Sequence, residues 1–145
     1  MPSVSPIRVL VVDDEDDMRR LFRLALEYDD NFAVVGDAAD GLDAARLAAE
    51  LVPEAVVLDW AMPRLGGAAA LVEIKAAAPA ARVVVVSAHE RADVESAARE
   101  AGADAYLEKT HAIDALPAVL RRLCREEVDL REAPAPAPSR GPDQP

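Results

Sequence analysis

The stretch AVVLDWAMPRLGG, residues 55–67, decides the fold of this chain. It opens with an uninterrupted apolar run, 55–58, and the run ends at Asp59. A short apolar run bounded by turn residues is typical of a strand that is buried on both faces. Pro63 and the two glycines that close the stretch then indicate a loop before the next helix. Asp59 therefore lies at the exit of a buried strand, which makes its carboxylate a candidate functional group.

The same unit of a strand and a following helix recurs along the whole chain. Short apolar runs alternate with segments in which apolar residues return at helical spacing. This alternation predicts an α/β fold, a doubly wound parallel sheet of five strands with helices on both faces. The predicted strands are 7–12, 32–35, 55–59, 83–87 and 105–107, and the predicted helices are 18–26, 41–51, 67–78, 91–101 and a final one to about 127.

The start of the final helix depends on Pro117. A proline in a helix interior removes a backbone donor, whereas in the first turn that donor has no partner in any case. Asp114 is a residue type that caps helix N-termini. We therefore expect Asp114 to be the N-cap and the helix to begin near residue 115.

Length and composition limit the classes of protein to consider. The 145 residues, 52% of them hydrophobic, suit one domain, and the net charge of −11 argues against direct binding of nucleic acid. The single cysteine excludes an internal disulfide and fits a reducing compartment. No apolar stretch approaches the roughly 18 residues that span a bilayer, and residues 1–6 lack a signal pattern. We expect a cytoplasmic protein that makes no use of a membrane.

The domain is predicted to occupy residues 5–128. Residues 129–145 are rich in proline and alanine and offer almost nothing to bury. Such a composition is typical of a disordered tail or linker.

Polar groups follow the other predicted strands too. Asp13 and Asp14 come after the first strand, Ser87 ends the fourth and Lys109 follows the fifth. The carboxyl ends of parallel strands meet at one edge of the sheet, and ligands bind in the crevice outside that edge. Mg²⁺ prefers oxygen ligands and is usually held by one or two carboxylates plus phosphate oxygens. The sequence thus predicts a magnesium site to which Asp14 and Asp59 contribute.

The acids at residues 13–17 have a second interpretation. Carboxylates in the first turn of a helix interact favourably with the helix dipole. We assign Glu15, Asp16 and Asp17 to this structural role, and Asp13 and Asp14 to the metal.

Four motifs in this order resemble the receiver domain of two-component response regulators. The resemblance runs from about residue 7 to 127 and implies a flavodoxin-like sheet with strand order 2-1-3-4-5. The motifs are VVDDED (11–16), VVLDWAMPRLGG (56–67), VVVVSAHE (83–90) and AYLEKT (105–110).

The resemblance implies roles for five residues around one reaction. Asp59 matches the phosphoacceptor, which takes a phosphoryl group from the phosphohistidine of a histidine kinase. Asp14 matches the direct Mg²⁺ ligand, Asp13 assists it, and the backbone carbonyl of Ala61 completes the protein ligands. Lys109 matches the lysine that contacts the phosphoryl group.

Three further residues are implied in signalling. Ser87 matches the switch hydroxyl and Tyr106 the aromatic residue that turns inward on activation. His89 occupies a position that tunes how fast water removes the phosphoryl group. The plain alternatives are a half-buried strand tyrosine and an exposed loop histidine.

The chain departs from the family pattern at Thr110, where a proline usually follows the lysine. Some regulators with a helix-turn-helix output domain also lack this proline, and Lys109-Thr110 resembles them. Without proline a trans peptide bond is the expectation. A stand-alone receiver and a receiver cut in its linker both fit the sequence.

The implied partners are a histidine kinase or phosphotransfer protein, a downstream protein or an output domain, and a second copy paired through the fourth and fifth helices. The chain would act as a phosphoacceptor that assists its own phosphorylation and dephosphorylation, not as an enzyme on other molecules.

Two rival functions are a pseudo-receiver that is never phosphorylated and an aspartate-nucleophile phosphatase of the haloacid dehalogenase type. The phosphatase family requires a second aspartate two residues after the nucleophile, where this chain has Ala61.

Overall fold

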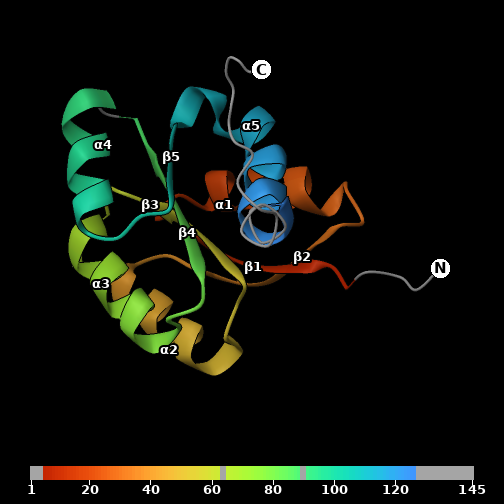
Figure 1. Cartoon of the computed structure of the whole chain (residues 1–145), viewed down its shortest axis with the longest axis horizontal. Coiled ribbons are helices and arrows are strands. Elements are labelled where there is room, and N and C mark those ends of the chain that lie inside the picture. Colours follow the sequence, from red (N-terminus) through yellow and green to blue (C-terminus); the bar gives the residue numbers. More distant parts are fainter. Residues whose placement is uncertain (1–4, 63–64, 89–90, 127–145) are drawn as a thin grey trace, which may run out of the picture.

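Five strands form one parallel sheet in the order β2-β1-β3-β4-β5 (Figure 1). The computed structural model describes residues 5–62, 65–88 and 91–126. The predicted α/β class and strand order are confirmed. The strands are β1 (Ile7–Val12), β2 (Phe32–Ala38), β3 (Ala55–Asp59), β4 (Arg82–Ser87) and β5 (Ala105–Glu108).

Helices cover both faces of the sheet, with α2, α3 and α4 on one side and α1 and α5 on the other (Figure 1). Two apolar clusters result, one under each helical layer. The helices are α1 (Asp16–Glu27), α2 (Gly41–Leu51), α3 (Gly67–Ala77), α4 (Arg91–Glu100) and α5 (Lys109–Arg121), and a short π-helix, Arg122–Glu126, follows α5.

The continuous apolar runs are explained by burial on both faces. In β3, Val56 and Leu58 face the layer of α2, α3 and α4, while Ala55 and Val57 face α1 and α5. Every residue of β3 is buried, Asp59 included. A central strand therefore shows no alternation of polar and apolar residues.

The second strand is longer than predicted. It continues through Gly36 and Asp37 to Ala38, where the sequence indicated an end at residue 35. A register shift after Val9 lets Leu10 pair with Gly36, so the ladder with β1 continues. This pairing is a tertiary interaction that the polar and flexible residues of β2 do not reveal.

The predicted start of the final helix is wrong. The helix α5 begins at Lys109, Glu108 is its N-cap, and Pro117 lies in its interior. Ala112 and Leu116 are fully buried against the sheet, and this packing offsets the roughly 3 kcal/mol that an interior proline costs. Thr110 contributes as well, because a proline at that position would disfavour the helical conformation of Lys109.

Two further expectations concern the ends of the chain and the membrane. The predicted tail, 129–145, lies outside the described residues, so the boundary of the domain stays a prediction. None of the helices in the described ranges is both long and apolar enough to cross a bilayer.

Candidate functional site

The ends of four strands bring the predicted residues to one edge of the sheet. Asp13 follows β1, Asp59 and Ser87 end β3 and β4, and Lys109 follows β5. The register sets them level, because Asp59 pairs with Val86 and Ser87 with Glu108. Residues as far apart as 13 and 109 therefore meet at one place.

Three carboxylates form a compact cluster at this edge. Asp13, Asp14 and Asp59 each offer an oxygen, and these oxygens all lie within 4.8 Å of one another. Asp13 and Asp59 are buried, with 0% and 4% of their surface exposed, whereas Asp14 is exposed. The cluster thus has a buried base and a side open to solvent.

The ammonium group of Lys109 lies among these acids. Its Nζ is 3.1 Å from Oδ2 of Asp13, 3.5 Å from Oδ2 of Asp59 and 3.7 Å from Oε1 of Glu15. Lys109 is the first residue of α5, so the helix fixes the backbone from which this side chain extends. One cation is shared by three carboxylates.

The electrostatics of the site disfavour the charged form of both buried acids. Burial raises the pKa of Asp59 to about 6, with a further contribution from the charge of Asp13, and Lys109 offsets this only in part. Burial also raises the pKa of Asp13, against the opposing effects of the Glu15 N–H and Lys109. Burial alone would lower the pKa of Lys109, but Asp59, Asp13 and Glu15 together raise it.

The cluster fits a divalent cation on its own chemistry. Oδ2 of Asp13 is buried and has no hydrogen-bond partner within the described part of the chain, since Lys109 approaches it as an ion pair only. Its other oxygen accepts a hydrogen bond from the backbone N–H of Glu15, at 2.9 Å. A set of carboxylate oxygens, one of them buried without a hydrogen bond, is the kind of ligand set that Mg²⁺ binds.

The loop after Asp59 is held close to the site. The N–H of Ala61 donates to Oδ1 of Asp59 at 3.4 Å, and the N–H of Gly67 donates to the carbonyl of Trp60 at 2.9 Å. A Cβ on Gly67 would lie 2.5 Å from that carbonyl oxygen, whereas a Cβ on Gly66 would meet nothing within 4 Å. Of the two predicted loop glycines, Gly67 is the one that close backbone approach requires.

The predicted switch residues are both buried. Ser87 is 1% exposed at the end of β4. Tyr106 is 4% exposed and packs in the same cluster as Val94 and Ala98 of α4, so it is not the half-buried strand tyrosine of the plain alternative. His89, the predicted tuning residue, lies outside the described residues.

The interpretation of the acids after Asp14 needs one correction. Asp16 and Asp17 are in the first turn of α1, as predicted. Glu15 is the N-cap residue, but its side chain makes no capping hydrogen bond and instead lies near Lys109. No pattern in the sequence indicates this contact, because it depends on the packing of α5 beside α1.

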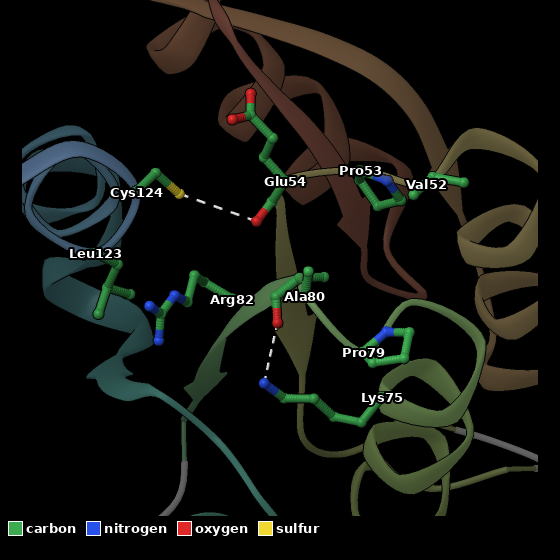
Figure 2. Close-up of a pocket in the computed structure, with 10 residues that line it drawn as sticks. Val52, Pro53, Glu54, Lys75, Pro79, Ala80, Arg82, Leu123 and Cys124 are labelled. Atoms are coloured by element: carbon green, nitrogen blue, oxygen red, sulfur yellow. Dashed lines mark hydrogen bonds between the residues drawn. The ribbon is translucent and has the colours of Figure 1, made fainter. Parts of the chain in front are cut away.

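A pocket of about 540 Å³ lies at the opposite edge of the sheet (Figure 2). Its charged groups already have partners. Lys75 donates to Asp104 at 2.8 Å, Arg82 lies 3.6 Å from the same carboxylate, and Glu54 pairs with Arg125 at 3.0 Å. Burial raises the pKa of the Cys124 thiol in its lining to about 11, so this thiol is a poor nucleophile. The chemistry of the fold is therefore concentrated at the acidic edge. Its lining residues are Val52, Pro53, Glu54, Lys75, Pro79, Ala80, Ala81, Arg82, Leu123 and Cys124.

Comparisons with known proteins show the family of this chain. The family model of the response regulator receiver domain matches residues 9–121. A protein-glutamate methylesterase/protein-glutamine glutaminase of Myxococcus xanthus is 46% identical over 114 residues, 78% of this chain and 33% of that protein. Response regulator MprA of a Mycobacterium species is 36% identical over 140 residues, 97% of this chain and 56% of that protein. The chain thus spans from a third to just over half of these curated relatives.

Solved structures lead to the same family. The response regulator domain of CheB from Thermotoga maritima has a TM-score of 0.73 at 32% identity, covering 89% of this chain and 99% of that one. A LuxR-family two-component response regulator from Aurantimonas has a TM-score of 0.78 at 32% identity, covering 84% of this chain and 87% of that one.

Proposed function

This chain belongs to the receiver domains of two-component response regulators, and we propose that Asp59 accepts a phosphoryl group from a histidine kinase or a phosphotransfer protein. The observation that carries the proposal is the position of Asp59. Its nearly buried carboxylate lies beside two other acids and 3.5 Å from the Lys109 ammonium group. Structural carboxylates rarely occur in such a group of like charges.

Receiver domains generally bind Mg²⁺, and the residues of this cluster suit that ion. Asp13, Asp14 and Asp59 would hold it, and the backbone carbonyl of Ala61 stays a predicted fourth contribution. The bound ion supplies positive charge that offsets both the repulsion among the acids and the charge of the phosphoryl oxygens.

Asp59 and Lys109 have different roles in the transfer of the phosphoryl group. An oxygen of Asp59 forms the new bond to phosphorus, while the bond from phosphorus to the donor imidazole breaks and its electron pair stays on nitrogen. Lys109, whose Nζ lies 3.5 Å from Oδ2 of Asp59, would bind a phosphoryl oxygen and favour the ionised form of Asp59. Positioning and charge therefore account for the reactivity, without a separate acid or base.

Ser87 and Tyr106 would carry the change outward. Phosphorylation adds charge and acceptor oxygens at Asp59, and the hydroxyl of Ser87 at the neighbouring strand end can donate to them. Tyr106 already lies inward in this structure, so we propose that phosphorylation stabilises this inward position and the adjoining surface of α4, β5 and α5. A downstream protein, an output domain or a second copy of the chain would bind that surface.

The test is incubation with acetyl phosphate and Mg²⁺, followed by intact mass and by assay of released phosphate. We expect one phosphoryl adduct that requires Mg²⁺. The absence of an adduct would favour the pseudo-receiver function. Steady release of phosphate from varied esters would favour the phosphatase, although Ala61 stands where that family needs a second aspartate.

A further inference from the structure

The peptide bond between Asp13 and Asp14 has a side-chain partner in α1. Nη1 of Arg19 donates to the backbone carbonyl of Asp13 at 2.7 Å. That carbonyl belongs to the peptide plane linking the two predicted metal ligands. A change in the ψ angle of Asp13 would move this carbonyl and turn Asp14 relative to Asp13, so the contact with Arg19 restrains one of the angles that set the relative orientation of the two carboxylates.

Arg19 is itself held on two further sides. Nη2 donates to the carboxylate of Asp16, and Nε lies 3.8 Å from Oδ1 of Asp37 in β2. Asp37 also accepts a hydrogen bond from Arg23 at 3.0 Å. With only 17% of its side chain exposed, Arg19 differs from an ordinary surface arginine, whose flexible head group contributes little.

Two further hydrogen bonds of Asp13 use its N–H group and its side chain, not this carbonyl. The N–H of Asp13 donates to the carbonyl of Ala38 at 3.1 Å, and Oδ1 accepts from Glu15. These bonds fix where the residue lies and how its side chain points. The planar guanidinium group of an arginine can donate to a carbonyl and to a carboxylate at once. Arg19 does so here, to the carbonyl of Asp13 and to the carboxylate of Asp16.

We propose that Arg19 is a positioning residue that aligns Asp13 and Asp14 for Mg²⁺, an inference that rests on the proposed function. It touches neither the phosphoryl group nor the ion. Partners of metal ligands commonly contribute about 10- to 100-fold to metal affinity by orienting the ligands.

Electrostatic repulsion alone predicts the opposite effect on Mg²⁺ affinity. Arg19 is a cation beside a cation site, so removing its charge would reduce repulsion and tighten Mg²⁺ binding. The direction of the change therefore separates positioning from simple electrostatics.

The experiment is a Mg²⁺ titration of the whole chain, followed by the fluorescence of Trp60 and repeated by calorimetry. We expect Arg19→Ala to weaken Mg²⁺ binding by about tenfold and Arg19→Lys to weaken it less, since lysine keeps the charge and one donor. Arg20→Ala is the matched control. Arg20 is the next residue of α1, and its pair with Asp17, at 3.2 Å, is largely exposed, so its removal should leave the affinity unchanged.

Thermal unfolding without Mg²⁺, run on the same variants, separates positioning from stability. A merely structural role would lower the melting temperature of Arg19→Ala and leave the affinity of the folded protein unchanged. Binding by Arg19→Ala that is as tight as wild type or tighter overturns the inference, and if that variant does not fold, unchanged affinity in Arg19→Lys does so. A wild-type protein that binds no Mg²⁺ overturns the metal site and this inference together.

Discussion

At the scale of the residue, Asp59 is placed where its charge opposes folding. Its pKa in the folded chain is about 6 against an ordinary value of 3.8, chiefly through burial and then through Asp13. Between these two values the folded state binds more protons than the unfolded state, so stability falls as pH rises through that window. Above pH 6 or so the full destabilisation by the buried charge remains. Functional carboxylates often carry such a cost.

Asp59→Asn should therefore stabilise the protein in the absence of Mg²⁺. At neutral pH we expect a gain of about 1 to 3 kcal/mol, and the gain should shrink as pH falls toward 3.8, where wild type is protonated too. Denaturant unfolding across this pH range measures it. The control is Asp30→Asn at an exposed turn, and an Asp59→Asn gain that did not change with pH would contradict the electrostatic explanation.

The sequence predicted most of this site at the residue scale. Asp13, Asp14, Asp59, Ser87 and Lys109 each end or follow a recognisable apolar run, and parallel strands must bring such ends to one edge. The contacts of Glu15 and Arg19 could not be predicted in the same way, because each depends on how α1 lies against β2 and α5.

At the scale of the element, the loop between β3 and α3 depends on one glycine. A side chain on Gly67 would collide with the backbone of Trp60, next to Asp59. We expect Gly67→Ala to lower stability by about 2 kcal/mol. Gly66→Ala should be neutral or slightly stabilising, because its Cβ would meet nothing. Urea midpoints of the two variants measure the difference, and equal midpoints would refute the steric explanation.

The helix α5 shows why element boundaries were harder to predict. Proline rules are local, and they placed the helix start after Asp114. The actual start at Lys109 is fixed by burial of Ala112 and Leu116 on the sheet, which requires the tertiary structure. The helix contains an interior proline, and burial of its apolar face offsets the missing hydrogen bond.

Pro117→Ala should consequently raise stability. The substitution restores a backbone donor for the carbonyl of Ile113, and we expect a gain of about 1 kcal/mol after the added entropy of the unfolded chain is subtracted. Pro79→Ala is the matched control, since Pro79 is exposed beyond the end of α3 and its removal affects mainly the unfolded state. We expect it to be slightly destabilising. A loss of stability in both variants would show that α5 gains nothing from the donor.

At the scale of the whole molecule, the two edges of the sheet differ in how their charged groups are arranged. The acids of the candidate site gather at one edge, while Lys75, Arg82 and Arg125 form ion pairs with Asp104 and Glu54 at the other. Figure 2 shows Lys75, Arg82 and Glu54 at that edge. The sequence predicted the layers and the edge that carries the site from the alternation of strands and helices. It did not predict the network at the opposite edge, whose members are scattered along the chain.

Mg²⁺ should stabilise the whole domain through this acidic edge. A ligand that binds only the folded state raises the melting temperature with its concentration, and a rise at constant ionic strength distinguishes binding from screening. Asp14→Ala should abolish the rise and leave the metal-free melting temperature almost unchanged, because Asp14 is exposed. An equal rise in Asp14→Ala would place the ion elsewhere.

The most direct test of the central claim is to locate the phosphoryl group. After incubation with acetyl phosphate and Mg²⁺, peptide mapping of wild type should find a single acid-stable, base-labile phosphoryl group on Asp59. Asp59→Asn should carry none, and neither should wild type without Mg²⁺. A group found on Ser87 or any other residue of the wild type, or an adduct that survives in Asp59→Asn, would contradict the account.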